Sequence, residues 1–285
     1  MTELEGFTDL RSPVMVAAFE GWNDAGDAAS SAVDHLEVVW DAEPFAAIDP
    51  EDYYDFQVNR PTVTLVDGTT RRVQWPTTRF SLCRLESRDV VLLRGLEPNM
   101  RWRTFCEEII DIARELGIEM TVTLGALLSD SPHTRPVPVS GTASDAATAM
   151  RLDLDRSRYE GPTGIVGVLH DACNQSGMSS VSFWAAVPHY VAQPPSPKAT
   201  IALLRRVEDV LDLAVPLGEL PAQAAEWERQ VDLLAAEDTE IAEYVRSLEE
   251  REPDDGLEET SGDAIAHEFE KYLRRRGEQR GPGEL

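Results

Sequence analysis

Residues 14–36 read VMVAAFEGWNDAGDAASSAVDHL, and this stretch decides the fold class. Residues 14–19 form a short apolar run bounded by turn residues, which is typical of a strand buried on both faces of a sheet. In the polar, glycine-bounded loop that follows, Asp24 is a good N-cap, because its carboxylate can accept hydrogen bonds from the first helical turn. Apolar residues at helical spacing then continue to Leu36. The stretch therefore predicts a strand, a loop and a helix, the repeating unit of α/β proteins.

Length and charge narrow the possible classes of protein. A chain of 285 residues suits one large α/β domain with an appendage. It has 52 acidic and 26 basic residues, a net charge of −26, which repels nucleic acids and anionic membrane surfaces. The first 13 residues lack the basic and apolar segments of a secretory signal, and no apolar run approaches the roughly 20 residues that cross a bilayer. We therefore expect a cytoplasmic protein that binds neither nucleic acid nor membranes.

Metal and cofactor chemistry has little support in the sequence. Cys83, Cys106 and Cys173 are odd in number and lack C-x-x-C spacing, which favours buried thiols over disulfides or a zinc site. The five histidines include no i, i+4 pair that would give a metal one helix face. The chain also lacks a P-loop lysine motif, G-x-G-x-x-G, H-E-x-x-H and G-x-S-x-G. We expect no metal site and no cofactor.

Further elements follow from apolar periodicity. Helices are expected at residues 101–116, near Ala146 and from residue 197 to about 213, and Asp67-Gly68 marks a hairpin turn. Strands alternating with helices predict a mostly parallel, buried sheet, with the pieces before residue 86 as an antiparallel annex. The aromatic residues at 183, 184 and 190 are expected on an apolar helix and its exit, in the core or at a subunit interface. The additional strands are expected at residues 46–48, 53–59, on both sides of Asp67-Gly68, and at 79–85, 89–95, 118–128 and 164–170.

The C-terminal third is expected to be helical and acidic. Residues 1–217 are predicted to form the sandwich domain, and residues 218–251 a helical appendage. An apolar three-four alternation from Trp227 to Leu248 is interrupted only by Asp238, which predicts one amphipathic helix or a helical hairpin. Residues 252–262 are polar and acidic, as in a flexible linker, and residues 263–285 are predicted to form a terminal helix and tail.

Polar side chains follow three of the predicted strands. In open α/β sheets, ligands bind outside the carboxyl ends of the strands. If the three loops converge, their carboxylates and imidazoles would share one crevice suited to acid-base work on a small polar substrate. The structural alternative is that Asp24 caps a helix, that His133 braces a turn between prolines, and that Asp171 with Asn174 caps the next helix. Lys198, near the start of a helix, is more typical of ordinary surface. The candidate crevice residues are Glu20, Trp22, Asn23, Asp24, Asp130, His133, Arg135, His170, Asp171 and Asn174.

Several blocks of sequence resemble a known family. FEGWNDAGDAA (19–29), YDFQVNRP (54–61), PHTRPVPVSG (132–141) and the segment 159–204 are similar to the proteasome assembly chaperone 2 family, particularly its bacterial members. The resemblance implies a three-layer α/β/α sandwich similar to nucleoside phosphorylases. In the eukaryotic relatives it implies a role in escorting proteasome α-subunits into rings. This chain ends in RGPGEL rather than in the hydrophobic-tyrosine tail by which some members enter proteasome pockets.

Two functions follow from these observations. The first is a non-enzymatic protein that binds protein partners, such as proteasome subunits, in proteasome assembly or a related step. It is expected to form a homo-oligomer, because phosphorylase-like sandwiches commonly associate and the chain has apolar helical stripes beyond its sheet. The analogy to that fold favours a trimer over a dimer. The alternative is a small-molecule enzyme or ligand-binding protein that uses the crevice at the carboxyl ends of the strands. No phosphorylase phosphate-binding or base-binding residue can be matched to a position in this chain.

Overall fold

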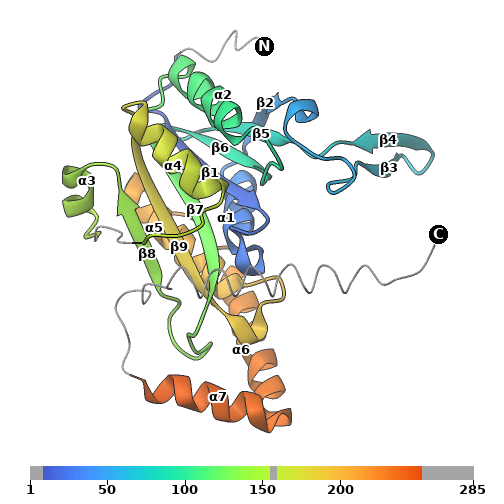
Figure 1. Cartoon of the computed structure of the whole chain (residues 1–285), viewed down its shortest axis with the longest axis vertical. Helices are drawn as coiled ribbons and strands as arrows, with labels where there is room; N and C mark the ends of the chain where they lie inside the picture. The colour runs from blue at the N-terminus through green and yellow to red at the C-terminus, as the bar shows by residue number, and fades with distance from the viewer. Residues whose placement is uncertain (1–8, 155–158, 252–285) are drawn as a thin grey trace.

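A computed structural model of the chain describes residues 9–154 and 159–251, in which strands and helices alternate (Figure 1). The strands are β1 (Val14–Glu20), β2 (Glu43–Ile48), β3 (Thr62–Val66), β4 (Thr70–Gln74), β5 (Thr78–Arg84), β6 (Asp89–Leu96), β7 (Met120–Ser129), β8 (Val139–Ala143) and β9 (Ser179–Pro188). The helices are α1 (Ala28–Val39), α2 (Trp102–Glu115), α3 (Ala146–Arg151), α4 (Ile165–Gln175), α5 (Pro197–Leu211), α6 (Leu220–Glu237) and α7 (Thr239–Glu250), with short 3₁₀ turns η1 (Ala25–Asp27), η2 (Pro50–Asp52) and η3 (His189–Val191).

Seven of the strands form one sheet in the order β2-β5-β6-β1-β7-β9-β8. Its centre is parallel, because β1 pairs in parallel with β6 and β7, and β7 pairs in parallel with β9. The antiparallel pairs lie toward the two edges. Residues 79–85, predicted to extend an antiparallel annex, form the antiparallel strand β5, but this strand belongs to the main sheet and not with the β3–β4 hairpin. Phe80 pairs with Leu93 of β6, and burial of both side chains in the core holds β5 there.

Helices cover both faces of this sheet, which confirms the predicted α/β sandwich. On one face, α1 and α5 pack on alternate residues of β1, such as Val16 and Ala18. On the other face, α2 and α4 pack on the intervening residues, such as Met15 and Phe19. Because side chains alternate across a strand, an unbroken apolar run supplies both layers at once. Figure 1 shows α2 and α4 in front of the sheet and α1 and α5 behind it.

Two segments have the opposite secondary structure to the one predicted: a predicted strand is a helix, and a predicted helix is a strand. Residues 164–170 do not form a strand, because Ile165, Val166, Leu169 and Cys173 recur at helical spacing and bury one face of α4. The expected aromatic helix is instead β9, whose ten residues pair with β7 over its whole length. A short apolar run does not by itself distinguish a buried strand from a buried helix.

The segment before the hairpin also differs from the prediction. Residues 53–59 form turns rather than a strand, because the amides of Tyr53 and Tyr54 both donate to the carbonyl of Pro50. Both tyrosines are buried against the α2 side of the sheet. The hairpin turn is as predicted: Asp67 and Gly68, at φ 54° and 73°, join β3 to β4 in a separate two-stranded sheet.

The C-terminal helices form a pair with a break at Asp238. Its carboxylate accepts hydrogen bonds from the amides of Glu240 and Ile241 at 2.9 and 3.2 Å, so it ends α6 and caps α7. The helical-hairpin alternative is therefore the one that the structure adopts. The predicted linker 252–262 and the terminal helix lie outside the described residues, and the division of the chain into domains stays a prediction.

Two further expectations concern the described residues directly. Cys83, Cys106 and Cys173 are buried free thiols, as predicted, and burial raises the pKa of each, to about 12, 12 and 11 respectively. Within the two described ranges, no helix is both long and apolar enough to cross a membrane.

Candidate functional site

The first loop, at the carboxyl end of β1, places Asp24 as a helix cap. Its carboxylate accepts hydrogen bonds from the amides of Ala29 at 2.7 Å and Ser30 at 3.3 Å, across the intervening turn η1. The backbone of the loop also bridges to Ala126 of β7. Burial raises the pKa of Asp24 to about 6, and the hydrogen bonds from Ser30 and Ala29 oppose this shift. Asp24 thus makes the capping contacts that the structural alternative predicts.

Asn23, one residue earlier, joins the loop to a helix on the opposite face of the sheet. Its side-chain amide donates to Glu97 Oε1 over 2.8 Å, and the amide of Ile165, the first residue of α4, donates to the same oxygen over 2.9 Å. Asn23 is fully buried, and a Cβ placed on Gly164 would lie 2.0 Å from its Oδ1. The close approach therefore requires glycine at position 164.

Glu97 is a further residue of this loop cluster that the sequence reasoning missed. It directly follows β6, and its amide donates to the carbonyl of Glu20 at the end of β1. An acidic residue immediately after a buried strand was the signal that selected Glu20, and the same signal is present at Glu97. Its carboxylate lies at the amino terminus of α4, where the helix dipole and the free amides favour a negative charge. Glu97 therefore fastens the exits of two strands to one helix.

Glu20 belongs to a charge network on the α1 face of the sheet. Arg94 of β6 is buried and contacts Glu20 Oε1 at 2.7 Å and Asp34 Oδ1 at 3.0 Å. Arg79 contacts Asp34 and Glu37 beside it. A buried guanidinium requires such partners, because an unpaired charge in the interior is strongly unfavourable. Trp22 is half-buried on the same loop.

The second loop, after β7, is bound to the C-terminal helices. His133 is buried; its Nδ1 contacts the Tyr190 hydroxyl at 2.7 Å, and its Nε2 contacts Asp232 of α6 at 3.0 Å. Asp130 pairs with His189 at 3.2 Å. Arg135 donates to the backbone carbonyls of residues 249 and 251, at the end of α7. These contacts attach α6 and α7 to the loop.

Lys198 and its neighbours complete this attachment. The ammonium group at the first turn of α5 donates to the backbone carbonyl of His133 and pairs with Glu228 of α6 over 2.9 Å. The rings of His189 and Tyr190 contact Tyr244 of α7, with centroids 5.1 and 6.0 Å apart. We call one cluster the helix anchor: His133, Tyr190 and Lys198, with their partners Glu228 and Asp232 on α6 and Tyr244 on α7. The polar groups predicted for a crevice here form contacts within the chain.

The third group of candidate residues lies elsewhere. His170, Asp171 and Asn174 are on α4, because the strand predicted before them is that helix. His170 Nδ1 and Asn174 Oδ1 both contact the hydroxyl of Ser180, at the amino-terminal start of β9. Burial lowers the pKa of His170. These residues are at the opposite end of the sheet from the first two loops, so the three groups do not converge, and neither Asp171 nor Asn174 caps a following helix.

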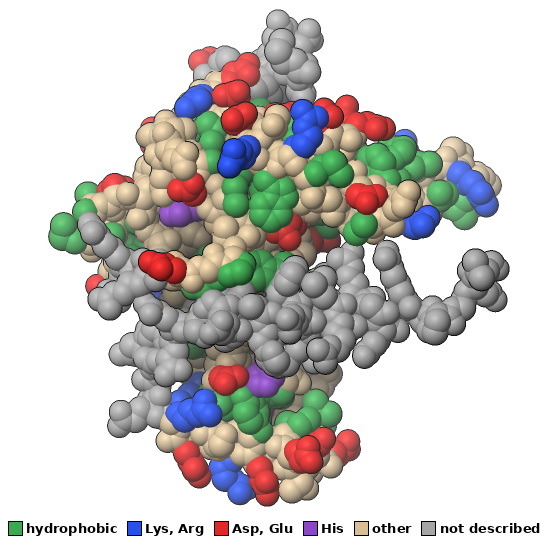
Figure 2. Space-filling model, viewed as in Figure 1, with side chains coloured by type: hydrophobic (Ala, Val, Ile, Leu, Met, Phe, Trp, Pro, Cys, Tyr) green, Lys and Arg blue, Asp and Glu red, His purple; other side chains and the backbone are tan. Residues whose placement is uncertain are grey.

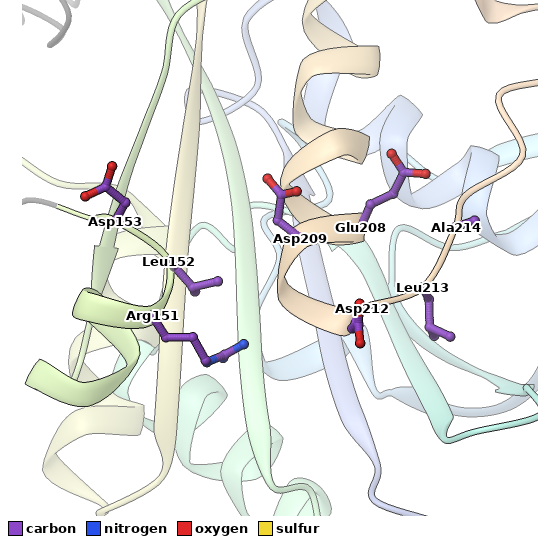
Figure 3. Close-up of a pocket in the computed structure, with 8 residues that line it drawn as sticks. All are labelled: Arg151, Leu152, Asp153, Glu208, Asp209, Asp212, Leu213 and Ala214. Atoms are coloured by element: carbon purple, nitrogen blue, oxygen red, sulfur yellow. The ribbon is translucent and has the colours of Figure 1, made fainter.

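Two hollows of the described surface lie away from the candidate loops. One, of about 540 Å³, lies between the end of α3 and the end of α5 (Figure 3). Its lining combines Arg151 with the carboxylates of Asp153, Glu208, Asp209 and Asp212. The other, of about 610 Å³, lies beside β2 and includes Trp75. Among the described residues, no cluster of three or more His, Cys, Asp or Glu side chains could hold a metal ion.

Comparison with known proteins gives one family. Residues 18–235 match the PAC2 family. A PAC2 family protein from Streptomyces avermitilis is 63% identical, with 82% of this chain and 99% of that chain covered and a TM-score of 0.78. A proteasome-assembly chaperone homologue from Mycobacterium tuberculosis is 62% identical, over 81% of this chain and 99% of that one, with a TM-score of 0.75. No curated protein matches the sequence.

More distant structures share only the fold. An archaeal proteasome activator from Pyrococcus furiosus, 16% identical, superposes with a TM-score of 0.64 over 79% of this chain and 94% of that chain. The sandwich is thus kept where the sequences have diverged almost completely. The family match begins near the end of β1 and spans the other strands, the first two candidate loops and most of α6. The high identity to two bacterial proteins extends over nearly their whole lengths. This chain belongs to the PAC2 family.

Proposed function

We propose that this chain is a chaperone-like, non-catalytic protein whose partners are proteasome components. The observation that carries the proposal is its 62% identity, over nearly the full length of that protein, to a proteasome-assembly chaperone homologue from Mycobacterium tuberculosis. A fold alone does not identify a function, but identity at this level over the whole sandwich makes a shared role the best-supported one. A cytoplasmic location, where proteasome subunits fold and assemble, is part of the same proposal.

The chemistry of the candidate residues supports a binding role. Asp24 is used as a helix cap, Glu20 pairs with Arg94, and His133 joins a loop to α6. Each of these groups holds one element against another. Such contacts keep a binding scaffold rigid, whereas a catalytic site requires acids and bases that converge on a substrate.

The proposal is tested by reconstitution. Purified proteasome α- and β-type subunits of the host are mixed with or without the full-length chain, and ring formation is followed by native electrophoresis and light scattering. We expect the chain to bind the α-type subunits and to change the rate at which rings form by severalfold. An unrelated protein of similar net charge is the control, because a charge of −26 can itself alter association. No binding and an unchanged rate would overturn the proposal.

One observation favours the alternative, a small-molecule enzyme or ligand-binding protein. Asp24 is a buried carboxylate with a pKa raised to about 6, and groups perturbed in this way are enriched at functional sites. A thermal-shift screen of nucleosides, phosphates and small acids tests it. A ligand that stabilises the wild type but not Asp24→Ser, while the variant still folds, would favour the alternative over the chaperone-like role.

A further inference from the structure

Helix α6 carries two adjacent exposed leucines. Leu233 and Leu234, near the end of the helix, are 65% and 43% exposed. Ala224 and Val231 are the buried residues of α6, so the contact that holds this helix leaves both leucines in water. We call Leu233 and Leu234 the leucine pair. A segment that covers the leucine pair would remove apolar surface from water, which is favourable.

The leucine pair lies on an acidic part of the chain. Residues 219–251, which include α6 and α7, contain ten acidic and three basic residues. Glu237 follows Leu233 by one helical turn and is exposed. Figure 2 shows carboxylates over the end of the molecule that α6 and α7 form, with hydrophobic side chains between them. A segment that fits this surface combines an apolar stripe with basic side chains.

The chain itself contains a sequence of this kind. Ile265, Phe269 and Leu273 recur every four residues, so a helix over residues 264–276 would carry one apolar stripe. Residues 271–280 contain five basic residues and one acidic residue, although the whole chain has twice as many acidic as basic residues. Both patterns come from the sequence alone, because these residues lie outside the described ranges. A helix of this length is marginal by itself in water, so it requires a surface that covers its stripe.

The end of α7 lies near the leucine pair. His133 contacts Asp232, which directly precedes the leucine pair in α6. Thr134, the next residue of the loop, donates to Glu249 at the end of α7 over 2.6 Å. Neighbouring residues of one loop thus contact both helices, so the chain leaves α7 a short distance from Asp232. The twelve residues 252–263 follow, and a stretch of that length spans up to roughly 40 Å, which is enough to return to the leucine pair.

We propose that residues 264–276 form a helix that docks on the leucine pair of the same chain. The stripe of Ile265, Phe269 and Leu273 covers the two leucines, and both apolar surfaces leave water together. The basic residues that begin at Lys271 face the carboxylates of α6 and α7, and this complementarity fixes the position of the docked helix. Residues 252–262 contain five acidic and no basic residues, so the connecting stretch is repelled by the same surface. The docking does not depend on which proteins the chain binds.

Cross-linking within the full-length chain tests the contact. In Leu234→Cys/Leu273→Cys, a short bis-maleimide should join the two thiols within one chain, and mass spectrometry identifies the linked peptides. The three native cysteines compete little, because they are buried and their thiols have raised pKa values. Val38→Cys/Leu273→Cys is the control; Val38 on α1 is 79% exposed, and its cross-link should form about tenfold more slowly. Equal rates, or linkage only between two chains, would overturn the proposal.

Further substitutions in the Leu234→Cys/Leu273→Cys chain separate the apolar part of the contact from the electrostatic part. Ile265→Ser/Phe269→Ser removes the stripe and should slow cross-linking by about tenfold. Arg274→Glu/Arg275→Glu/Arg276→Glu places like charges beside α6 and should slow it severalfold. The matched control, lysine at the same three positions, keeps the charge and should keep the original rate. An unchanged rate in either the serine or the glutamate variant would overturn the proposal, because the docked helix requires both the stripe and the charge.

Hydrogen exchange of the full-length chain tests the same contact without added cysteines. The amides of residues 264–276 should exchange roughly tenfold more slowly in the wild type than in Leu233→Ser/Leu234→Ser. Both leucines are exposed, so exchange in β1 should be the same in the two proteins. Met150→Ser, at a position that is 81% exposed on α3, is the control and should behave as the wild type. If exchange in residues 264–276 does not depend on the leucine pair, the segment is not held there and the proposal is wrong.

Discussion

The side-chain amide of Asn23 donates a hydrogen bond to the carboxylate of Glu97 over 2.8 Å, beneath the first turn of α4. The same Glu97 oxygen accepts a hydrogen bond from the amide of Ile165. Three elements that are distant in sequence, β1, β6 and α4, are thereby fixed at one point. These hydrogen bonds hold the loop that carries Asp24. Their contribution to stability can be measured without knowing which protein the chain binds.

Asn23→Ala should lower the free energy of unfolding by about 1–3 kcal/mol, because it removes a buried side chain and leaves the half-buried Glu97 carboxylate with one fewer donor. Urea unfolding followed by circular dichroism measures the change. Gln57→Ala, at an exposed position, is the control and should differ from wild type by less than about 0.5 kcal/mol. An equal effect of the two substitutions would show that the hydrogen bond contributes nothing.

Gly164→Ala should also destabilise the protein, by about 1–3 kcal/mol, because the new Cβ would lie 2.0 Å from Asn23 Oδ1. Combining it with Asn23→Ala removes the nearest of the clashing atoms and leaves Glu97 Oε1, at 2.8 Å. The double variant should therefore lose less stability than the two single variants together, by about 1 kcal/mol in the same unfolding experiment. Strict additivity would mean that the helix start moves away from Asn23 without cost.

Asp24→Asn should alter how stability depends on pH. The pKa of Asp24 is raised from 3.8 to about 6 in the folded protein, so its contribution is most favourable below pH 3.8 and is lost as pH rises through 6. The asparagine oxygen can still accept from the helix amides but does not ionise. From pH 4 to pH 7.5 the wild type should lose about 1–3 kcal/mol relative to the variant, measured by urea unfolding at each pH. A constant difference across this range would contradict the raised pKa.

His133→Ala should loosen α6 and α7 while leaving the sheet intact. It removes the contacts to Tyr190 and Asp232 that belong to the helix anchor. Losing about 1–2 kcal/mol of hydrogen bonding should speed amide hydrogen exchange in the two helices by roughly tenfold. Hydrogen exchange with mass spectrometry measures this, with Arg246→Ala on the exposed face of α7 as the control. An equal increase of exchange in β1 and β6 would show that the helix anchor stabilises the whole domain, and it would contradict this prediction.

The sequence predicted correctly those parts of the fold in which the apolar pattern is long or is interrupted by a turn or capping residue. β1 and α1 follow from an apolar run, a polar loop and a helical stripe in one segment. The turn at Asp67-Gly68 follows from two residues that tolerate positive φ. The break at Asp238 follows from one polar residue in an apolar alternation, since its side chain caps the second helix.

The errors arise where local pattern is ambiguous. Residues 164–170 are apolar enough for either a strand or a buried helix, and assigning a strand there placed His170, Asp171 and Asn174 at the wrong end of the sheet. The choice depends on which segment pairs with β7, and that place is taken by β9. Pairing between strands is a long-range contact, so no window of the sequence contains it.

The sequence by itself determined the α/β class, the cap at Asp24, the acidic helical C-terminal part and the resemblance to a family, because each depends on residues close together in the chain or on motifs in order. Only the tertiary structure decided that Glu97 and Arg94 are the partners of Asn23 and Glu20, and that His133 binds α6. Those choices depend on strand order and helix packing. They bring together side chains tens of residues apart, where burial makes an unpaired polar group costly and selects its partner.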